Sequence, residues 1–572
     1  MGRKKLAFPK LFTVFKEIRL FFRRNHAASK ESDPDIEEPS LYPEEPFPVL
    51  GRTRSLFKKC CEKHETVCGK DRATSIKLSL IDCKTRYIVS GRSHIKYAAL
   101  SYVWGTSEII PSRHDAVGLS LPSEAALVIE DAIKAALYLG LKYLWVDQYC
   151  MEQIDKKKKA QQIRQMHRIY NDAEVTLVAA VGSDAHSGLA ALCLPSELIT
   201  EYSRNGAAEA ETDKDMWDPN SGLQRSLRQI EKSVWNTRGW TYQESFVSRR
   251  VIVFHQYGVY FECATTAAES IESTEVSEPL DASDGWWTDQ GIPNGPRARY
   301  LSTYINADMM TWLAHLITEY SQRSLKYQSD TINAFSAVLQ DFDGRQSIPF
   351  ANCDDDMGTA YSLLNLNDES PWRISIVHGV PFYTGEIDPS KISSARMNSA
   401  GLCWHYGNCS GSGNGSARKP EFPSWSWAGW TGPIEWKLPQ SWSSETILHV
   451  TNITFVEASR NFQRELTFEE AKEAQSPLLS FYSVAIPPRS FFEADSGRQS
   501  DNGICLHNYI LSWPKRGFLC HSDCSKTSRL TLLKGLQEGT CRLVLLYVHL
   551  SYDIMGFQGW ILQRCENRKP VL

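Results

Sequence analysis

Asp147 is the residue whose position in the sequence most directly suggests chemistry. It follows the apolar run 141–146, within the segment WVDQYC at 145–150. A carboxyl group at the end of an apolar strand loses hydration, so it must be paired with another group or used by the protein. Asp147 therefore belongs to a functional site, or it caps the following loop or pairs with an arginine.

A second candidate position follows the apolar run 97–103, where Trp104 and Gly105 stand. Backbone N–H groups in the connection 105–107 could bind a phosphate group. This connection has one glycine and neither the Gly-x-Gly-x-x-Gly nor the Walker pattern, so it supports nucleotide binding only weakly.

Two small groups of cysteine and histidine have spacings that a zinc ion could use. The first comprises Cys61, His64 and Cys68, with Cys60 adjacent, and the second comprises Cys520, His521 and Cys524. Neither contains the paired Cys-x-x-Cys units of a structural zinc site, so we expect ordinary thiols and no bound metal. The sequence also lacks Gly-x-Ser-x-Gly and His-Glu-x-x-His, which removes the commonest serine-hydrolase and zinc-protease signatures.

Alternating strands and helices must position these residues. The apolar runs 97–103, 141–146 and 174–181 are typical of buried strands, and helical periodicity covers 122–139 and 156–170 between them. Two successive β-α-β units with short connections predict an α/β fold with a parallel sheet flanked by helices. Ligands bind outside the carboxyl ends of such strands, and this is where the first two candidate positions lie.

Changes in charge and residue composition along the chain predict its division into several parts. Residues 1–30 hold nine Lys or Arg and one acid, whereas residues 31–46 hold seven acids and no base. The expected parts are a basic amphipathic segment with an acidic, proline-rich linker (1–48), an N-terminal extension (49–96), an α/β domain (97–270) with an insertion (183–232), a helical region (271–345) and a β-rich C-terminal region (346–572).

The basic segment 1–30 has two interpretations. It predicts an amphipathic helix that makes peripheral contact with an anionic membrane or occupies a partner's groove. The alternative is a frayed terminus, or a helix docked on the same protein.

The overall charge and the cysteine content limit the function classes. The 63 basic and 67 acidic residues give a net charge of −4, so no global field attracts nucleic acid. Fifteen cysteines without a secretory signal predict reduced thiols and a cytoplasmic protein. No apolar run approaches the length of a membrane span.

Four successive blocks of the chain resemble the fungal heterokaryon-incompatibility (HET) domain. These blocks are YAALSYVWG (97–105), LGLKYLWVDQYCMEQID (139–155), QIRQMHRIYNDAEVTLVAA (162–180) and RGWTYQES (238–245). Segments 320–339 and 422–432 resemble sequences that often accompany this domain. The resemblance implies a fungal protein of nonself recognition and programmed cell death, and it does not by itself imply a reaction.

The order of strands and helices also resembles a TIR (Toll/interleukin-1 receptor) domain, which has a flavodoxin-like parallel sheet. In enzymatic TIR domains a Trp-Cys-x-x-Glu block supplies a carboxylate for NAD cleavage, and Trp240 and Glu244 have the same spacing here. Thr241 replaces the cysteine, and about fifty residues separate the block from the third strand.

This resemblance implies that Glu244 stabilises an oxocarbenium-like state, with Asp147 as a second polar group. The residues that it implies for contact with NAD are Tyr102, Trp104, Gly105, Trp240 and Gln243. NAD would be a substrate, and no cofactor is expected. The alternatives are a structural Glu244 paired with Arg238 or Arg249, and tryptophans that pack in the core. A second function class also stays open, namely a non-enzymatic module that assembles with itself or a sensor and recruits an effector.

Overall fold

The computed structural model describes residues 47–69, 75–105, 117–189, 192, 222–256, 258–263, 267–269, 309–343 and 373–384, together with shorter segments between 402 and 563. The predicted basic segment and its linker lie outside these residues, apart from 47 and 48. Within the described part of the chain, no helix has the length and apolarity needed to cross a membrane.

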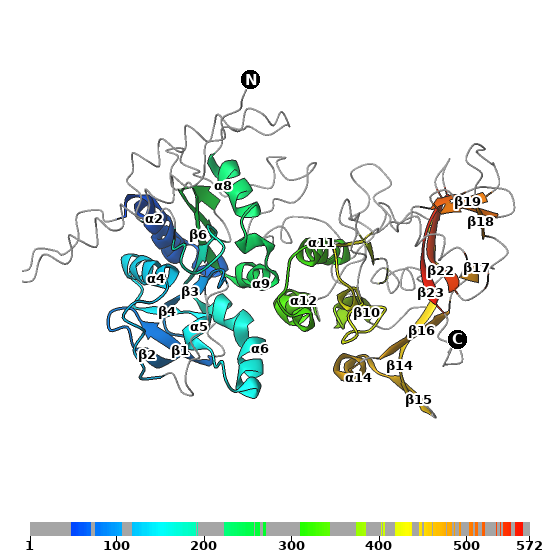
Figure 1. Ribbon diagram of the computed structural model, residues 1–572, viewed down its shortest axis with the longest axis horizontal. Helices are drawn as coiled ribbons and strands as arrows, with labels where there is room; N and C mark the ends of the chain where they lie inside the picture. The colour runs from blue at the N-terminus through cyan, green and yellow to red at the C-terminus, as the bar shows by residue number, and fades with distance from the viewer. Residues whose placement is uncertain are drawn as a thin grey trace, which may run out of the picture. The chain divides into compact units, whose positions relative to one another are not determined.

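An eight-stranded mixed sheet organises the first half of the described chain (Figure 1). Its spatial order is β2-β1-β4-β3-β5-β6-β7-β8. The strands are β1 (Lys77–Asp82), β2 (Ile88–Arg92), β3 (Tyr97–Ser101), β4 (Tyr143–Trp145), β5 (Val175–Ala179), β6 (Arg250–His255), β7 (Gly258–Cys263) and β8 (Ala267–Glu269).

The prediction of a parallel sheet is confirmed for its centre and wrong for its edges. Strands β4, β3, β5 and β6 are mutually parallel, whereas β1 pairs antiparallel with β2 and β4, and β7 pairs antiparallel with β6 and β8. Short connections explain the pairs β1–β2, β6–β7 and β7–β8, which are neighbours in sequence; residues 256–257 alone join β6 to β7. A parallel pair needs a crossover of a dozen or more residues.

The four parallel strands, numbered along the chain, have the spatial order 2-1-3-4, which is the order of the first strands of flavodoxin-like sheets. The chain leaves β3 in one direction and returns past it to β5 in the other. The helices α4 (Leu127–Tyr138) and α6 (Lys156–Asp172) therefore cover opposite faces (Figure 1). The strand order reverses between β3 and β5, and this reversal places a ligand-binding position at their carboxyl ends.

The helix predicted over 122–139 begins later, at Leu127. The preceding residues are held by side chains instead of helical hydrogen bonds. Glu130 accepts a hydrogen bond from the N–H of Ala125 at 3.2 Å, and Arg86 donates both to Glu130 and to the carbonyl oxygen of Pro122. This network fixes an extended entry into the helix.

Local sequence signals fix two other helix ends. Gly140 follows the C-cap of α4 with a φ of +84°, a left-handed conformation that favours glycine, and its N–H donates to Leu137. Asp155 caps the N-terminus of α6, where its carboxylate accepts hydrogen bonds from the N–H groups of Lys157 and Lys158.

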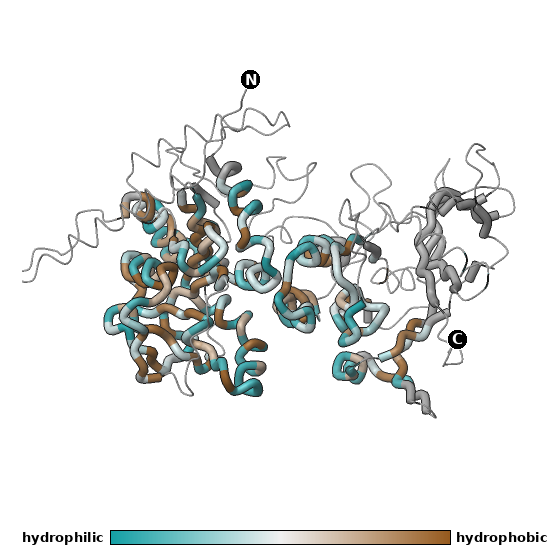
Figure 2. The backbone as a smooth tube through the Cα atoms, in the orientation of Figure 1, coloured by the Kyte–Doolittle hydropathy of each residue, from teal (hydrophilic) through white to brown (hydrophobic). Residues whose placement is uncertain are grey.

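Further helices lie before the sheet, after β4 and in the crossover from β5 to β6. The helices α2 (Pro48–Lys63) and α3 (Glu65–Cys68) precede the sheet, and α5 (Asp147–Cys150) follows β4. The last crossover holds α8 (Gly222–Glu231), η1 (Trp235–Thr237) and α9 (Gly239–Val247). Figure 2 shows apolar stretches along the sheet and hydrophilic stretches on α6.

Helices after the sheet pack against α9. They are α11 (Met309–Ser321), η4 (Gln328–Asp330), η5 (Asn333–Phe335) and α12 (Ser336–Phe342). Tyr242 of α9 contacts the rings of Tyr320 and Phe335, which also contact Trp427 of η7 (Trp427–Gly429). An aromatic cluster thus joins α9, which lies in the crossover from β5 to β6, to α11, η5 and η7.

The C-terminal part contains short antiparallel sheets and one parallel pair, β19 with β21, as a β-rich region predicts. The strands are β9 (Arg373–Val377), β10 (Val380–Thr384), β11 (Trp404–Tyr406), β12 (Ile434–Trp436), β13 (Thr446–Leu448), β14 (Thr451–Ser459), β15 (Phe462–Leu466), β16 (Leu478–Tyr482), β17 (Ala485–Ile486), β18 (Phe491–Glu493), β19 (Gly503–Leu506), β20 (Tyr509–Ser512), β21 (Phe518–Cys520), β22 (Cys541–Leu550) and β23 (Met555–Gln563). The helix α14 (Phe468–Glu473) lies between β15 and β16.

Candidate functional site

A buried row of polar side chains crosses the carboxyl end of β3. Ser101 is the last residue of that strand, and its hydroxyl donates a hydrogen bond to the Glu244 carboxylate. The same hydroxyl accepts a hydrogen bond from the indole N–H of Trp235 at 2.7 Å. Because all three residues are buried, the row orients Glu244 firmly at the edge of the sheet.

The environment of Glu244 favours its protonated form. The pKa of Glu244 is raised to about 7, chiefly by burial and also by the charge of Asp147, while the Ser101 hydrogen bond, the charge of Arg238 and the Tyr170 hydroxyl act in the opposite direction. Tyr170 is fully enclosed, and its hydroxyl also donates to the carbonyl oxygen of Leu100 at 3.1 Å. Glu244 can therefore gain or lose a proton near neutrality.

Asp147 is separated from β4 by Val146 and is the first residue of α5. One carboxylate oxygen accepts from the N–H of Gln148 at 2.7 Å, and the other accepts from the indole N–H of Trp104 at 2.8 Å. Asp147 is half-buried, and burial raises its pKa to about 6 although these hydrogen bonds and Arg238 lower it. Asp147 thus binds the N–H of the residue that follows it and the indole of the loop after β3.

Arg238 connects the two carboxyl groups electrostatically. Its charge lowers the pKa of both Glu244 and Asp147, so it is a neighbour that the two acids share. Its guanidinium donates to the carbonyl oxygen of Tyr102 at 3.4 Å. Arg249, the other predicted partner of Glu244, binds the carbonyl oxygens of Asn171, Asp172, Ala173 and Cys68 instead.

The loops after β3, β4 and β5 contact one another at the carboxyl ends of these parallel strands. The hydroxyl of Tyr102 donates to the side chain of Gln148 at 3.0 Å. Gly105 has a φ of +75°, and a Cβ at this position would lie 2.4 Å from the Cβ of Asp184 in the loop after β5. The structure thus brings Tyr102, Trp104, Gly105 and Asp147 into neighbouring loops at the carboxyl ends of the parallel strands.

Two of the predicted ligand-contact residues point elsewhere. The side-chain oxygen of Gln243 accepts from the N–H of Ala337 at 2.8 Å and from the hydroxyl of Ser336. Trp240 forms a side-chain hydrogen bond with Asp330. Both residues therefore attach α9 to the following helices, and the structure does not bring Gln243 to the carboxyl pair.

Sequence reasoning missed the contacts of Glu244 with Ser101 and Tyr170, and the hydrogen bond from Trp235 to Ser101. The sequence carries one signal for them, because Ser101 is a polar residue at the end of the otherwise apolar strand 97–101. Its partner Glu244 stands 143 residues further along the chain. No local pattern predicts a contact at that separation.

The arrangement is suited to proton transfer and to stabilising positive charge. Two acids with pKa values of about 6 and about 7 lie close to a shared arginine. Near neutral pH one of them can be ionised while the other still carries a proton. The partly exposed indole ring of Trp104 borders this region, where its N–H donates to Asp147.

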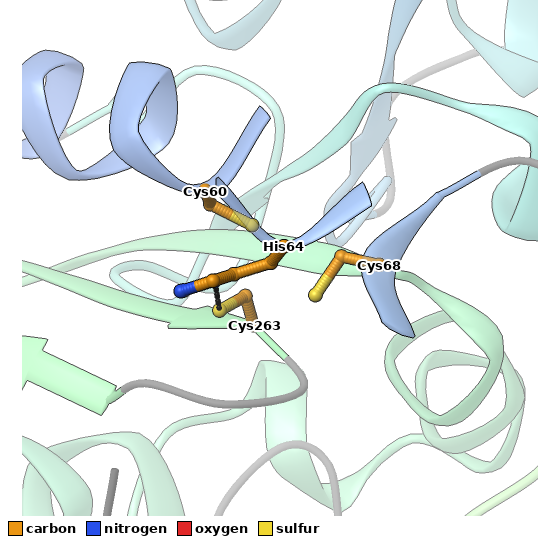
Figure 3. Close-up of side chains that lie close together, drawn as sticks. All are labelled: Cys60, His64, Cys68 and Cys263. Carbon is orange, nitrogen blue, oxygen red and sulfur yellow. Dashed lines mark hydrogen bonds between the residues drawn. The ribbon is translucent and has the colours of Figure 1, made fainter. Parts of the chain in front are cut away.

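Side chains that can bind a metal ion lie together at the opposite end of the parallel strands. Cys60, His64, Cys68 and Cys263 lie together there (Figure 3). Cys263 pairs with Arg250, the first residue of β6, which places the cluster at the amino ends of the parallel strands. It is therefore separate from the carboxyl pair.

Comparison with known proteins identifies the segment that contains the carboxyl pair. Residues 97–244 match the family model described as heterokaryon incompatibility protein (HET). No curated protein and no solved structure matches the chain. The matched segment begins with β3 and ends at Glu244, so it includes both acids and Ser101. Residues 97–244 of this chain therefore form a heterokaryon-incompatibility (HET) domain.

Proposed function

We propose that this HET domain hydrolyses NAD at the nicotinamide–ribose bond, in a heterokaryon-incompatibility response that leads to programmed cell death. The observation that carries the proposal is the pair of acids with raised pKa values, Glu244 and Asp147, at the carboxyl edge of a parallel sheet where the strand order reverses. This is the position at which such sheets bind nucleotides.

The reaction makes modest demands on the protein. The bond between ribose C1′ and nicotinamide N1 breaks, and its electron pair goes to N1, so neutral nicotinamide leaves without a general acid. Ionised Glu244 stabilises the positive charge that develops on the ribose. A water oxygen then bonds to C1′, and its proton passes to Asp147. Trp104 offers an aromatic face to the cationic ring.

This scheme has a specific dependence on pH. Since the pKa of Glu244 is raised to about 7, its ionised fraction increases steeply between pH 6 and pH 8. The rate of NAD cleavage should therefore rise over this range.

The test is release of nicotinamide by the purified full-length protein, at a concentration that permits self-association. Glu244→Gln keeps the shape and removes the charge, so the rate should fall by roughly a hundredfold or more with NAD binding little changed. Glu262→Gln is the matched control, because Glu262 is also 6% exposed but lies on β7 and accepts from Tyr260. It should remain within a few-fold of wild type. Equal rates for well-folded wild type and Glu244→Gln would refute the role of Glu244.

One observation supports a second function without catalysis. Glu244 is 6% exposed and already hydrogen-bonded to Ser101, which is also what a structural carboxylate requires. The domain would then act by assembling with copies of itself or with a sensor and by recruiting an effector. Wild-type protein that self-associates in light scattering and releases no nicotinamide would favour this function.

A further inference from the structure

Four side chains with metal-binding atoms converge between the N-terminal helices and the sheet (Figure 3). Cys60 lies in α2, His64 separates α2 from α3, Cys68 ends α3 and Cys263 ends β7. One ligand atom from each residue lies within 4.8 Å of those of the other three. The distance from the Cys263 sulfur to Nδ1 of His64 is 3.6 Å.

The backbone explains why three of these residues share one face. The N–H of His64 donates to the carbonyl oxygen of Cys60, and the N–H of Cys68 donates to that of His64. These bonds continue the helical spacing across the junction of α2 and α3, so residues at i, i+4 and i+8 align. Strand β7 supplies Cys263 from the opposite side (Figure 3).

The composition and the enclosure of the cluster match those of a structural zinc site. Cys60 and Cys68 are 1% exposed and Cys263 is 2% exposed, while His64 is half-buried. Three cysteines and one histidine form a known tetrahedral ligand set, in which the sulfur atoms lie about 3.8 Å apart around zinc. Ligand atoms already within 4.8 Å of one another need to move by about 1 Å or less to reach this geometry.

The surroundings also fit thiolate ligands. The guanidinium of Arg250 donates from Nε to the Cys60 sulfur at 3.0 Å, and Arg250 is 3% exposed. Arg249 donates to the carbonyl oxygen of Cys68 at 3.0 Å and holds the end of α3. Three thiolates and a divalent cation sum to a charge of −1, which the buried Arg250 balances.

We propose that Cys60, His64, Cys68 and Cys263 bind one Zn²⁺ ion, which fastens α2 and α3 to strand β7. The ion joins a segment before the HET domain to a strand after it. It therefore closes the folded unit around residues 97–244 and stabilises a unit larger than the family segment. A disulfide would use only two of the three thiols, and none of the three cysteines forms a disulfide in the structure.

The test is the zinc content of full-length protein that is purified without chelators or a metal-binding tag. Cys263→Ser and Cys68→Ser should each lose one zinc ion per chain relative to wild type, measured by elemental mass spectrometry. Cys61→Ser is the control, because Cys61 is adjacent in sequence but outside the cluster, and it should retain the wild-type content. The difference of one ion is the readout, since Cys520, His521 and Cys524 could bind a second one.

Cobalt exchange uses wild-type protein alone and so does not depend on variants that fold well, and chelation adds a comparison with the variants. Wild-type protein exchanged with Co²⁺ should show the visible bands of tetrahedral thiolate coordination. Chelation should lower the melting temperature of wild type and Cys61→Ser and leave that of Cys263→Ser unchanged. The proposal is overturned by wild-type protein that neither contains zinc nor takes up Co²⁺, by equal zinc in wild type and Cys263→Ser, by bound iron, or by a mass deficit of two hydrogens that reveals a disulfide.

Discussion

At the scale of single residues, burial of Glu244 affects both the stability of the folded protein and the basicity of the carboxylate. Burial in the protein disfavours its charge, and Ser101 and Tyr170 compensate for only part of that effect. An acid in such an environment is destabilising when it is ionised and is a stronger base than a solvated carboxylate. Asp147, which is half-buried, has a lower pKa than Glu244 and therefore loses its proton at a lower pH.

The stability of the protein should therefore depend on pH through Glu244. Its pKa is about 7 in the folded state against an ordinary value of 4.5, so the folded state binds the proton more tightly. The stabilisation is complete below pH 4.5 and is lost as the pH rises to 7, by about 3 kcal/mol in total. Between pH 5 and pH 8, the free energy of unfolding of wild type should fall relative to that of Glu244→Gln by about 2–3 kcal/mol. Urea denaturation at several pH values measures this difference, and parallel curves for the two proteins would contradict it.

At the scale of elements, the site depends on the close approach of two loops. The turn after β3 contains Gly105, and the turn after β5 places Asp184 directly against it. These turns follow the two strands between which the order of the sheet reverses. Their contact fixes the position of Trp104, which in turn donates to Asp147.

Gly105→Ala should therefore disturb the site more than a backbone penalty alone explains. A left-handed residue with a Cβ costs about 1–2 kcal/mol, and here the new Cβ would also overlap Asp184. Gly140→Ala is the matched control, because Gly140 has a φ of +84° and no heavy atom within 4 Å of the position of a Cβ. Thermal unfolding should show a larger loss for Gly105→Ala than for Gly140→Ala. Equal losses of stability in the two variants would mean that the loop after β5 shifts away from the new Cβ without a cost.

At the scale of the whole molecule, the HET domain is not a complete structural unit. Its matched segment ends at Glu244, within α9, and it lacks β6, which pairs with β5, and β1, which pairs with β4. Tyr242 of α9 is also buried against Tyr320 and Phe335 from later helices. The site is thus supported from both sides of the family segment.

A fragment of residues 97–244 should consequently fail to fold, whereas residues 47–436 should unfold cooperatively. The short fragment exposes both edges of its parallel strands and the aromatic face of α9. Far-ultraviolet circular dichroism and hydrogen exchange of the two fragments test this difference. Slow amide exchange at β3 and β5 in the short fragment would show that the outer strands are dispensable.

Local sequence by itself determined the central alternation of strands and helices, the end of α4 just before Gly140 and the place of Asp147 after a strand. These features follow from apolar periodicity and from residues with special backbone or capping properties, which act over a few positions. The start of α4 was predicted too early, because a distant Arg86 engages Glu130 and the carbonyl of Pro122.

Only the tertiary structure decided the strand order, the antiparallel edges and the partners of the buried polar groups. Ser101 and Glu244 are 143 residues apart, and His64 and Cys263 are 199 residues apart. Contacts at such separations arise from how the elements pack into layers, which no periodicity within one element specifies. For this reason the sequence indicated the cysteines near residue 60 without Cys263, and the carboxylate of Glu244 without its serine.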